Sequence, residues 1–385
     1  MHVLRSYLSV VALAAPLVNA LSSFAGANNY FAYALPSNER YALLQSMNAA
    51  NMKVLRTFVN GVSSGQKNGD NRAVPDLEPN AIRQYDDTIL NAIDQLMVEA
   101  HAWNIKLLIC VYDKNTLAAG GPYKAKYTES GFYTSATARD DYNQRITYML
   151  NGHKNALLGN QTWSFLGNYI FGYSVMNEPM INQGASFFQA NLAWVCNVAQ
   201  QIRNNVGDKN QLILTGGNSA TTSVQSYFFS SSCPAVDVVE IHDYTDAWDS
   251  YIPNAISQAK AAGKKLIVGE WGSLYGSERT ANLQDNMNKL NKHGVPWLYW
   301  EFITNADPHW GEDYEINVNG GSDGDFLTVK GYSQAAPQAV TRRALLDTSL
   351  PLGRCIKLTE ILQIGRVRHP LLSATRAGRL AKTRS

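Results

Sequence analysis

Residues 106–112 read KLLICVY and residues 265–269 read KLIVG, two short runs of consecutive apolar residues. A strand buried on one face alternates apolar and polar residues, and these runs do not alternate. Unbroken runs of this length are typical of strands covered on both faces, as in a parallel sheet with helices on each side. The two stretches therefore predict a parallel sheet inside an α/β fold.

Similar runs recur along the chain and alternate with segments of helical spacing. The expected strands are residues 23–30, 53–59, 106–112, 170–176, 211–215, 236–241, 265–268 and 296–300. Helical stripes are formed by Ile93, Leu96, Met97 and Ala100 and by Leu283, Met287 and Leu290. Eight strands alternating with helices predict a (β/α)8 TIM barrel in a single domain. A doubly wound open sheet would normally carry a G-x-G-x-x-G turn after its first strand, and the sequence contains none.

The two ends of the 385-residue chain differ from its body. Residues 1–20 hold one Arg, an apolar stretch and small residues before position 21, the layout of a secretory signal peptide. Residues 351–385 hold eight Lys or Arg against one Glu, whereas residues 21–350 carry a net charge of −6. We expect residues 21–350 to form the domain and residues 351–385 to be a disordered basic tail. Because the body is not basic and has no long apolar segment, we expect no nucleic-acid partner and no membrane span.

Cysteine and asparagine positions fit a secreted, extracellular chain, which we expect to be a monomer. Asn160 begins an Asn-Gln-Thr glycosylation sequon. Cys196 and Cys233 could form a disulfide in an oxidising compartment, although their spacing does not establish a pairing. Cys110 lies within an apolar run, so we expect a buried thiol there. The cysteines form no C-x-x-C pattern, and zinc is therefore not expected.

Chemically capable residues stand at the C-terminal ends of several expected strands, where TIM barrels place their active sites. These residues are Arg56 on the second strand, Asn177 and Glu178 after the fourth, His242 and Tyr244 at the sixth, Glu270 after the seventh and Trp300 at the eighth. All strands of a closed parallel barrel point the same way, so their ends meet at one mouth. We therefore expect Glu178 and Glu270 to face each other.

Two facing carboxyl groups suit the hydrolysis of a glycosidic bond. One group protonates the leaving oxygen while the other attacks the anomeric carbon, and retention requires them about 5–5.5 Å apart. Asn177 suits a hydrogen bond to the sugar 2-hydroxyl, and Arg56 would keep the nucleophile ionised. His242 and Tyr244 would orient the two carboxyl groups. Flat apolar faces for sugar rings are offered by Trp248, Trp271, Trp300 and Trp310.

The same residues resemble glycoside hydrolase family 5. The motifs are Leu55-Arg56-Thr57, Asn177-Glu178-Pro179, His242-Asp243-Tyr244, Gly269-Glu270-Trp271 and Tyr299-Trp300, and the resemblance covers roughly residues 23–345. It implies a retaining (β/α)8 hydrolase of β-linked polysaccharides that needs neither a metal nor an organic cofactor. It also implies that Glu178 is the acid/base and Glu270 the nucleophile. The remaining motif residues, Arg56, Asn177, His242, Tyr244 and Trp300, would line the subsite of the sugar that is attacked.

Within that family, residues 26–30 and 54–58 are most similar to fungal endo-β-1,4-mannanases. Phe58 departs from the Trp that mannanases commonly carry there. Cellulose, mixed-linkage glucan and β-glycosides therefore remain alternative substrates, and a barrel that binds carbohydrate without cleaving it remains a non-enzymatic alternative. Residues 60–80, 114–133 and 303–325 are long and polar, and we expect these loops to determine specificity.

Other hydrolytic mechanisms find less support. Residues 320–324 match the G-x-S-x-G pattern of serine hydrolases, but a nucleophile elbow needs a strand before it, and the preceding residues predict a loop. A chitinase-type barrel would carry a D-x-D-x-E run, and a metal-dependent barrel hydrolase an early H-x-H. Neither pattern is present.

Overall fold

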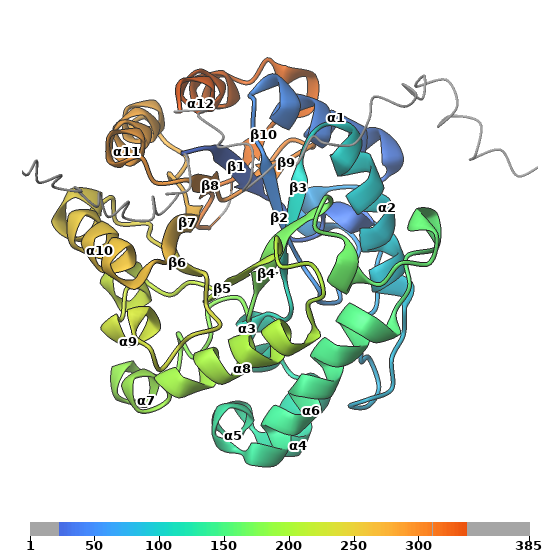
Figure 1. Ribbon diagram of the computed structural model, residues 1–385. Coiled ribbons are helices and arrows are strands. Elements are labelled where there is room, and N and C mark those ends of the chain that lie inside the picture. Colours follow the sequence, from blue (N-terminus) through green and yellow to red (C-terminus); the bar gives the residue numbers. More distant parts are fainter. Residues whose placement is uncertain (1–22, 310, 337–385) are drawn as a thin grey trace, which may run out of the picture. The chain divides into compact units, whose positions relative to one another are not determined.

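Eight parallel strands close into a barrel in the computed structural model, which describes residues 23–309 and 311–336 (Figure 1). The strands are β1 (Ala25–Asn28), β2 (Val54–Phe58), β3 (Lys106–Cys110), β4 (Ile170–Ser174), β5 (Leu212–Leu214), β6 (Val238–His242), β7 (Lys265–Trp271) and β8 (Trp297–Tyr299). Each strand pairs with its neighbours in chain order, and β1 pairs with β8 to close the circle. The predicted (β/α)8 fold is confirmed, and every expected strand lies within three residues of its observed ends.

The inside of the barrel changes from apolar to charged along the strands. Side chains two positions apart on a strand face the same side. Val54 and Val238 lie in the inner apolar cluster, and Arg56 and Glu240 follow them on the same face. The cluster consists of Phe24, Val54, Leu108, Phe171, Leu212, Leu214, Val238, Ile267 and Leu298. A packed apolar floor thus supports a charged layer closer to the strand ends.

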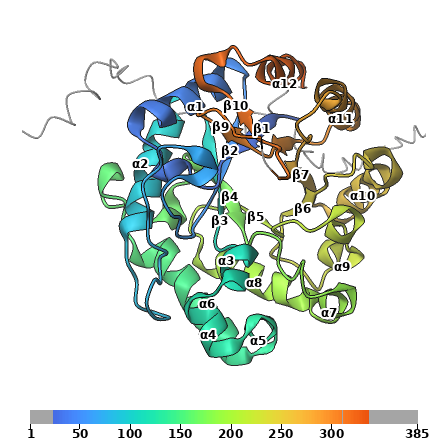
Figure 2. The same ribbon diagram turned by 180° about the vertical axis from the view of Figure 1, so that it is seen from behind.

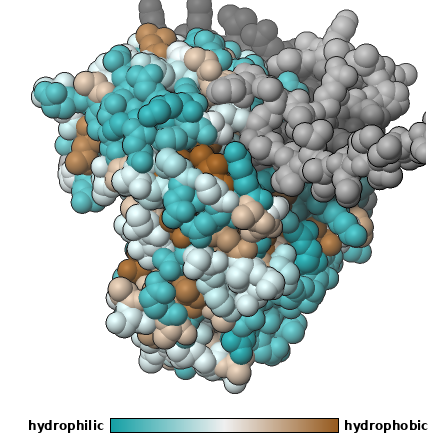
Figure 3. Space-filling model, turned by 60° about the vertical axis from the view of Figure 1, so that its left-hand side comes forward, coloured by the Kyte–Doolittle hydropathy of each residue, from teal (hydrophilic) through white to brown (hydrophobic). Residues whose placement is uncertain are grey.

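Helices surround the strands on the outside (Figures 1 and 2). The longer ones are α1 (Ser37–Ala49), α2 (Thr88–Ala102), α6 (Ala136–Thr147), α8 (Leu192–Asn205), α10 (Trp248–Ala262), α11 (Arg279–His293) and α12 (Gly324–Ala335). The predicted apolar stripes on α2 and α11 are buried against the barrel. On the face that Figure 3 shows, hydrophobic residues are scattered in small groups among hydrophilic ones. In the described part of the chain, no helix combines the length and the apolar character needed to cross a membrane.

The prediction of a loop at residues 114–133 is wrong. Three short helices occupy this segment, α3 (Lys114–Ala119), α4 (Gly121–Tyr127) and α5 (Glu129–Thr134). The Asp113 carboxylate accepts a hydrogen bond from the Thr116 amide, and the Thr128 hydroxyl accepts one from the Gly131 amide. Caps of this kind satisfy amides in the first turn of a helix. Local capping therefore starts helices in a segment whose polarity had indicated a loop.

Several predictions concern parts outside the described residues. These are the signal peptide at residues 1–20, the basic tail at residues 351–385 and the role of Trp310. The described residues do include the cysteines: Cys196 on α8 forms a disulfide with Cys233, and Cys110 is a buried free thiol. Asn160 of the sequon is exposed.

Candidate active site

Glu270 lies near the end of β7 and is held by two neighbours. The Arg56 guanidinium donates to one carboxylate oxygen, with 2.5 Å between Nη1 and Oε1. The Tyr244 hydroxyl donates to the other oxygen at 3.0 Å. Because Arg56 is fully buried within β2, its position is fixed by the barrel itself. The two contacts hold the Glu270 carboxylate in one orientation.

Glu178 follows β4 in an unusual backbone conformation. Its φ angle is +46°, in the left-handed region that residues with a side chain seldom adopt. The Glu178 amide donates to the Gly216 carbonyl at 2.9 Å, which ties this turn to the end of β5. Such strain costs about 1–3 kcal/mol and is often found at functional sites. One carboxylate oxygen, Oε1, lies 3.2 Å from His242 Nδ1.

The two carboxyl groups face each other as the sequence predicted. An oxygen of Glu178, an oxygen of Glu270 and a ring nitrogen of His242 all lie within 4.8 Å of one another. Glu178 is the more accessible of the two carboxylates, with 15% of its side chain exposed against 5% for Glu270. The Glu178 carboxylate therefore lies close to solvent, whereas the Glu270 carboxylate is enclosed by protein.

A buried charge network lies directly beneath the pair. Arg56 Nε lies 2.9 Å from Glu240 Oε1, and His242 Nε2 lies 3.5 Å from the same oxygen. Burial would raise the pKa of Glu240, but Arg56 and His242 outweigh it and lower that pKa to about 2. Burial would likewise lower the pKa of His242, but Glu270, Glu178 and Glu240 raise it to about 9. At neutral pH His242 is therefore an imidazolium surrounded by carboxylates.

Asn177 is oriented from both sides of its amide. Arg56 Nη2 donates to its carbonyl oxygen at 2.9 Å, and its amide nitrogen donates to Asp113 Oδ1 at 2.9 Å. The sequence analysis did not identify Asp113 or Glu240. Asp113 comes at the end of the third strand, and Glu240 precedes His242 by two positions on one strand face. Proximity to a strand end indicates Asp113, and the two-residue alternation of side chains along a strand indicates Glu240.

The predicted tryptophans separate into different environments. Trp300 follows β8, is half-buried, and stacks on Tyr30 with ring centroids 6.0 Å apart. Its ring also lies 6.0 Å from that of Phe58, the residue that replaces the usual Trp. Among the tryptophans that the structure describes at the strand ends, Trp300 is therefore the one that a sugar ring can reach.

Trp271 and Trp248 are not available to substrate, and the prediction for them is wrong. Both side chains are completely buried. Trp271 packs edge-on against Tyr299, because it follows Glu270 on β7 and so faces the opposite side of the strand. Trp248 begins α10, and its indole N–H donates to Asn286 at 2.7 Å. These two residues belong to the core between the barrel and its helices.

The serine motif does not form a nucleophile elbow. Ser322 is exposed in the turn between a short 3-10 helix (Asn319–Gly321) and α12. The next residue, Asp323, caps α12 by accepting hydrogen bonds from two of its amides. The motif therefore starts a surface helix.

Among the described residues, two groups of acidic and histidine side chains have ligand atoms close enough together to hold a metal ion. The first is Glu178, His242 and Glu270. His242 Nδ1 already contacts both carboxylates and Arg56 is bound to Glu270, so these groups satisfy one another and the set does not suit a metal. The second group is Asp307, His309 and Asp313, where His309 Nδ1 already contacts the Asp313 carboxylate.

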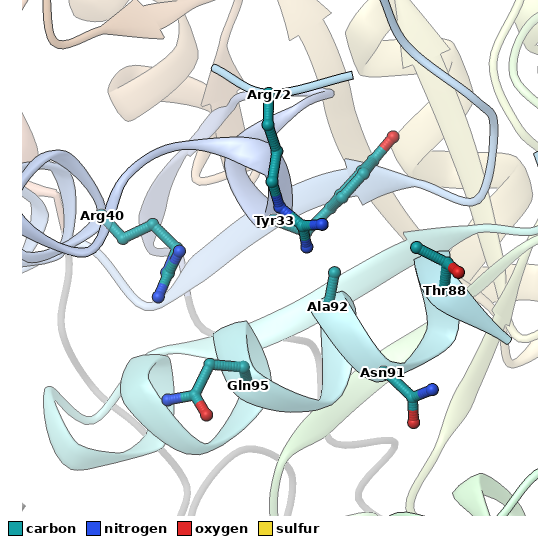
Figure 4. Close-up of a pocket in the computed structure, with 7 residues that line it drawn as sticks. All are labelled: Tyr33, Arg40, Arg72, Thr88, Asn91, Ala92 and Gln95. Carbon is teal, nitrogen blue, oxygen red and sulfur yellow. The ribbon is translucent and has the colours of Figure 1, made fainter. Parts of the chain in front are cut away.

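A hollow on the outside of the barrel lies between the α1 region and α2 (Figure 4). It measures about 390 Å³ and is lined by Tyr33, Arg40, Arg72, Thr88, Asn91, Ala92 and Gln95. Arg40 is occupied by a bidentate ion pair with Glu99, and the Tyr33 hydroxyl donates to the Asn60 carbonyl. None of the residues that line this hollow contacts Glu178 or Glu270.

Comparisons with known proteins bear on the family and the fold of the chain. A family model described as Cellulase (glycosyl hydrolase family 5) matches residues 22–306. No match was found among curated protein sequences. An endo-β-1,4-mannanase structure from Thermotoga petrophila aligns with a TM-score of 0.63 and 18% identity, over 82% of this chain and 77% of that chain.

Two further structures show the same similarity of fold. An endo-1,4-β-mannanase from Rhizomucor miehei aligns with a TM-score of 0.61 and 19% identity, over 82% of this chain and 95% of that chain. An exo-β-1,4-mannosidase from Opitutaceae bacterium strain TAV5 aligns with a TM-score of 0.59 and 17% identity, over 84% and 61% of the two chains. At these identities the similarity establishes the fold.

Proposed function

Because the chain belongs to glycosyl hydrolase family 5, we propose that it is a secreted, retaining endo-β-1,4-mannanase that cleaves plant mannans. The observation that carries the mechanism is the approach of Glu178 and Glu270 to within 4.8 Å. This separation fits double displacement, since inverting enzymes keep their carboxyl groups about 6.5–9.5 Å apart to admit a water molecule. An endo-β-1,4-glucanase with the same chemistry is the alternative.

In the first step, Glu270 attacks the anomeric carbon while Glu178 gives its proton to the departing glycosidic oxygen. The bond to that oxygen breaks and a covalent glycosyl-enzyme forms. In the second step, ionised Glu178 takes a proton from water, and the resulting hydroxide displaces Glu270. The exposure of the two side chains supports these roles, because the acid/base must reach both the leaving group and water.

The two carboxyl groups are close enough to titrate as a pair. Burial raises the pKa of Glu270, and the negative charge of Glu178 adds to this effect. Burial would also raise the pKa of Glu178, but His242 and Lys114 outweigh it and lower that pKa. These directions favour the shared proton on Glu270, whereas the mechanism needs it on Glu178 with a charge on Glu270, so only a fraction of the enzyme has the reactive protonation state at any pH. We therefore expect a narrow, bell-shaped pH dependence of kcat/KM.

The substrate and the compartment rest on separate observations. The motif resemblance supports mannan, and the names of two structurally similar proteins, an endo-β-1,4-mannanase and an endo-1,4-β-mannanase, agree with it. The composition of residues 1–20, the exposed Asn160 sequon and the Cys196–Cys233 disulfide support secretion, because disulfides persist in oxidising compartments.

The test is the release of reducing sugars and the lengths of the products from mannan and from carboxymethylcellulose. We expect the wild type to release short oligosaccharides from mannan, and Glu178→Gln and Glu270→Gln to lose at least about 1,000-fold in kcat. Glu278→Gln, at an exposed glutamate, is the matched control and should keep full activity.

Two further measurements separate the roles of the carboxylates. Azide should rescue Glu178→Ala by giving a β-glycosyl azide and Glu270→Ala by giving an α-glycosyl azide. NMR of early products should show the β-anomer. Inverted early products would contradict the mechanism. Faster cleavage of carboxymethylcellulose than of mannan would show that the protein is an endo-β-1,4-glucanase. If the wild type cleaves no β-glycan, the protein would be a barrel that binds carbohydrate without cleaving it.

A further inference from the structure

Lys114 is held beside Glu178 by the backbone. Beyond their strands, the chain segments after β3 and β4 continue side by side: the Asn177 amide donates to the Tyr112 carbonyl at 2.8 Å, and the Lys114 amide donates to the Asn177 carbonyl at 3.3 Å. Lys114 is also the first residue of α3, whose start is fixed by the Asp113 cap. The position of its Cα therefore follows from the barrel.

The Lys114 side chain reaches the oxygen of Glu178 that His242 does not contact. Lys114 Nζ lies 3.8 Å from Glu178 Oε2, whereas His242 Nδ1 contacts Oε1. Among the residues that the structure describes, Glu178 is the one carboxylate within ion-pair distance of this ammonium group. Both side chains are mostly buried, with 17% and 15% exposed, so solvent screens the pair incompletely.

The charged surroundings of Glu178 come from several elements. His242 on β6, Arg56 on β2 and Lys114 on α3 are cationic, whereas Glu270 on β7 and the nearby Asp113 carboxyl are acidic. The positive charges of His242 and Arg56 are shared with the Glu240 and Glu270 carboxylates. The Lys114 charge acts on Glu178 without another acidic partner of its own.

We propose that Lys114 is a positioning residue that acts through Glu178, holding Oε2 toward the leaving oxygen and shifting hydrolysis toward acidic pH. This inference rests on the proposed function of Glu178. Oε1 is occupied by His242, so Oε2 is the oxygen that carries the transferable proton. A cation beside Oε2 stabilises the ionised form and weakens the hold on that proton. The lowered pKa of Glu178, to which Lys114 contributes, agrees with this geometry.

The first test compares kcat/KM against pH for wild type, Lys114→Met and Lys114→Arg on the β-glycan that the wild type cleaves. We expect Lys114→Met to move the optimum to higher pH by about 0.5–1 unit. Lys114→Arg keeps the charge and should stay within about 0.2 units of wild type. Lys209→Met, at an exposed lysine, is the control for loss of a surface charge. Thermal melts check that each variant is folded.

The second test removes Glu178. In a Glu178→Gln background, hydrolysis of a dinitrophenyl β-glycoside needs no acid assistance in its first step, so Lys114→Met should leave the pH profile unchanged. A titration of 13C-labelled Glu178 by NMR, compared between wild type and Lys114→Met, tests the coupling even if no β-glycan is cleaved. An unshifted optimum together with an unshifted titration overturns the inference, as does a Lys114→Arg variant that behaves like Lys114→Met. A shifted titration in an inactive wild type overturns the proposed function alone.

Discussion

At the scale of single residues, the reactivity of Glu270 depends on two hydrogen-bond donors of different kinds. Arg56 supplies a charge that no pH change in the working range removes. Tyr244 supplies a neutral donor, 3.0 Å from Oε2, and is itself 36% exposed. Both donors favour the ionised form of Glu270, and so oppose the burial that raises its pKa. Removing the Tyr244 hydroxyl replaces none of Arg56, Glu240 and His242, the residues of the buried charge network.

We predict that Tyr244→Phe lowers kcat/KM about 10- to 100-fold, the range expected for a hydrogen bond to a charged group. Without the donor, the pKa of Glu270 rises further, so the nucleophile ionises only at higher pH. The acidic limb of the profile should therefore move to higher pH. The measurement is kcat/KM between pH 3 and 8, with Tyr41→Phe as the control because Tyr41 is exposed on α1. An unchanged acidic limb would show that Tyr244 does not act on the nucleophile.

At the scale of secondary-structure elements, strand ends could be predicted from the sequence, whereas side-chain direction was predicted only in part. Glu270 and Trp271 are neighbours at the end of β7, and proximity to the strand end suggested that both face substrate. The two-residue alternation of a strand allows only one of them to do so, and it is Glu270. Trp248 is the first residue of α10, so its position relative to a strand end does not indicate which way its side chain points. Alternation should therefore be applied before accessibility is inferred.

The features of the site that could not be predicted from the sequence depend on tertiary contacts. The distance between Glu178 and Glu270 depends on the register of strands that are far apart in the chain, with shifts between β6 and β7 that no local pattern predicts. The left-handed conformation of Glu178 likewise depends on the Gly216 carbonyl from the end of β5. The motif residues and their convergence at one mouth of the barrel could be predicted, but the distances and backbone conformations at the site could not.

The loop after β5 shows how an element shapes the site without contributing a reactive group. Gly217 has a φ angle of +75°, and a Cβ atom there would lie 2.2 Å from the His242 ring. We predict that Gly217→Ala displaces His242 and lowers kcat about 100-fold, as expected for a misplacement near 1 Å. Gly263→Ala is the matched control, since Gly263 has a φ angle of +67° but open space around it.

Gly263→Ala should lose about 1–2 kcal/mol in the free energy of unfolding, because it places a Cβ in the left-handed region, and Gly217→Ala should lose more, because its Cβ also meets the His242 ring. Chemical denaturation measures this loss, and initial rates measure kcat. Equal activity loss in both variants would mean that backbone strain, and not contact with His242, causes the effect.

At the scale of the whole molecule, the barrel carries buried histidines whose charge is part of the fold. His242 is one of them. In the described part of the chain, His153 is the other: its Nδ1 lies 3.1 Å from Asp87 and its Nε2 lies 2.9 Å from Asp94, both carboxylates of the α2 region. Burial would lower the pKa of His153, but Asp94 and Asp87 raise it. The folded protein thus holds protons that the unfolded chain releases near pH 6.5.

These protons predict how stability depends on pH. The raised pKa values of His153 and His242 stabilise the fold below about pH 6.5, and each contribution is lost as pH rises through the raised pKa, which is about 9 for His242. For His242 the shift to about 9 corresponds to about 3 kcal/mol. Glu240 acts in the opposite direction: its pKa, lowered to about 2, stabilises the fold above about pH 4.5 and loses this effect as pH falls toward 2. The melting temperature should therefore be highest between about pH 4.5 and 6.5.

Calorimetric melts from pH 3 to 9 test this prediction, and His153→Gln tests its cause. The variant should melt at a lower temperature than wild type at pH 5.5, and the difference should narrow as pH rises, because the wild type then loses the charge that the variant never had. Lys209→Gln, at an exposed lysine, is the control and should leave the pH dependence of the melting temperature unchanged. If stability instead rises steadily from pH 6.5 to 9, the buried histidines are neutral in the fold, and the imidazolium on which the site's charge balance depends is absent.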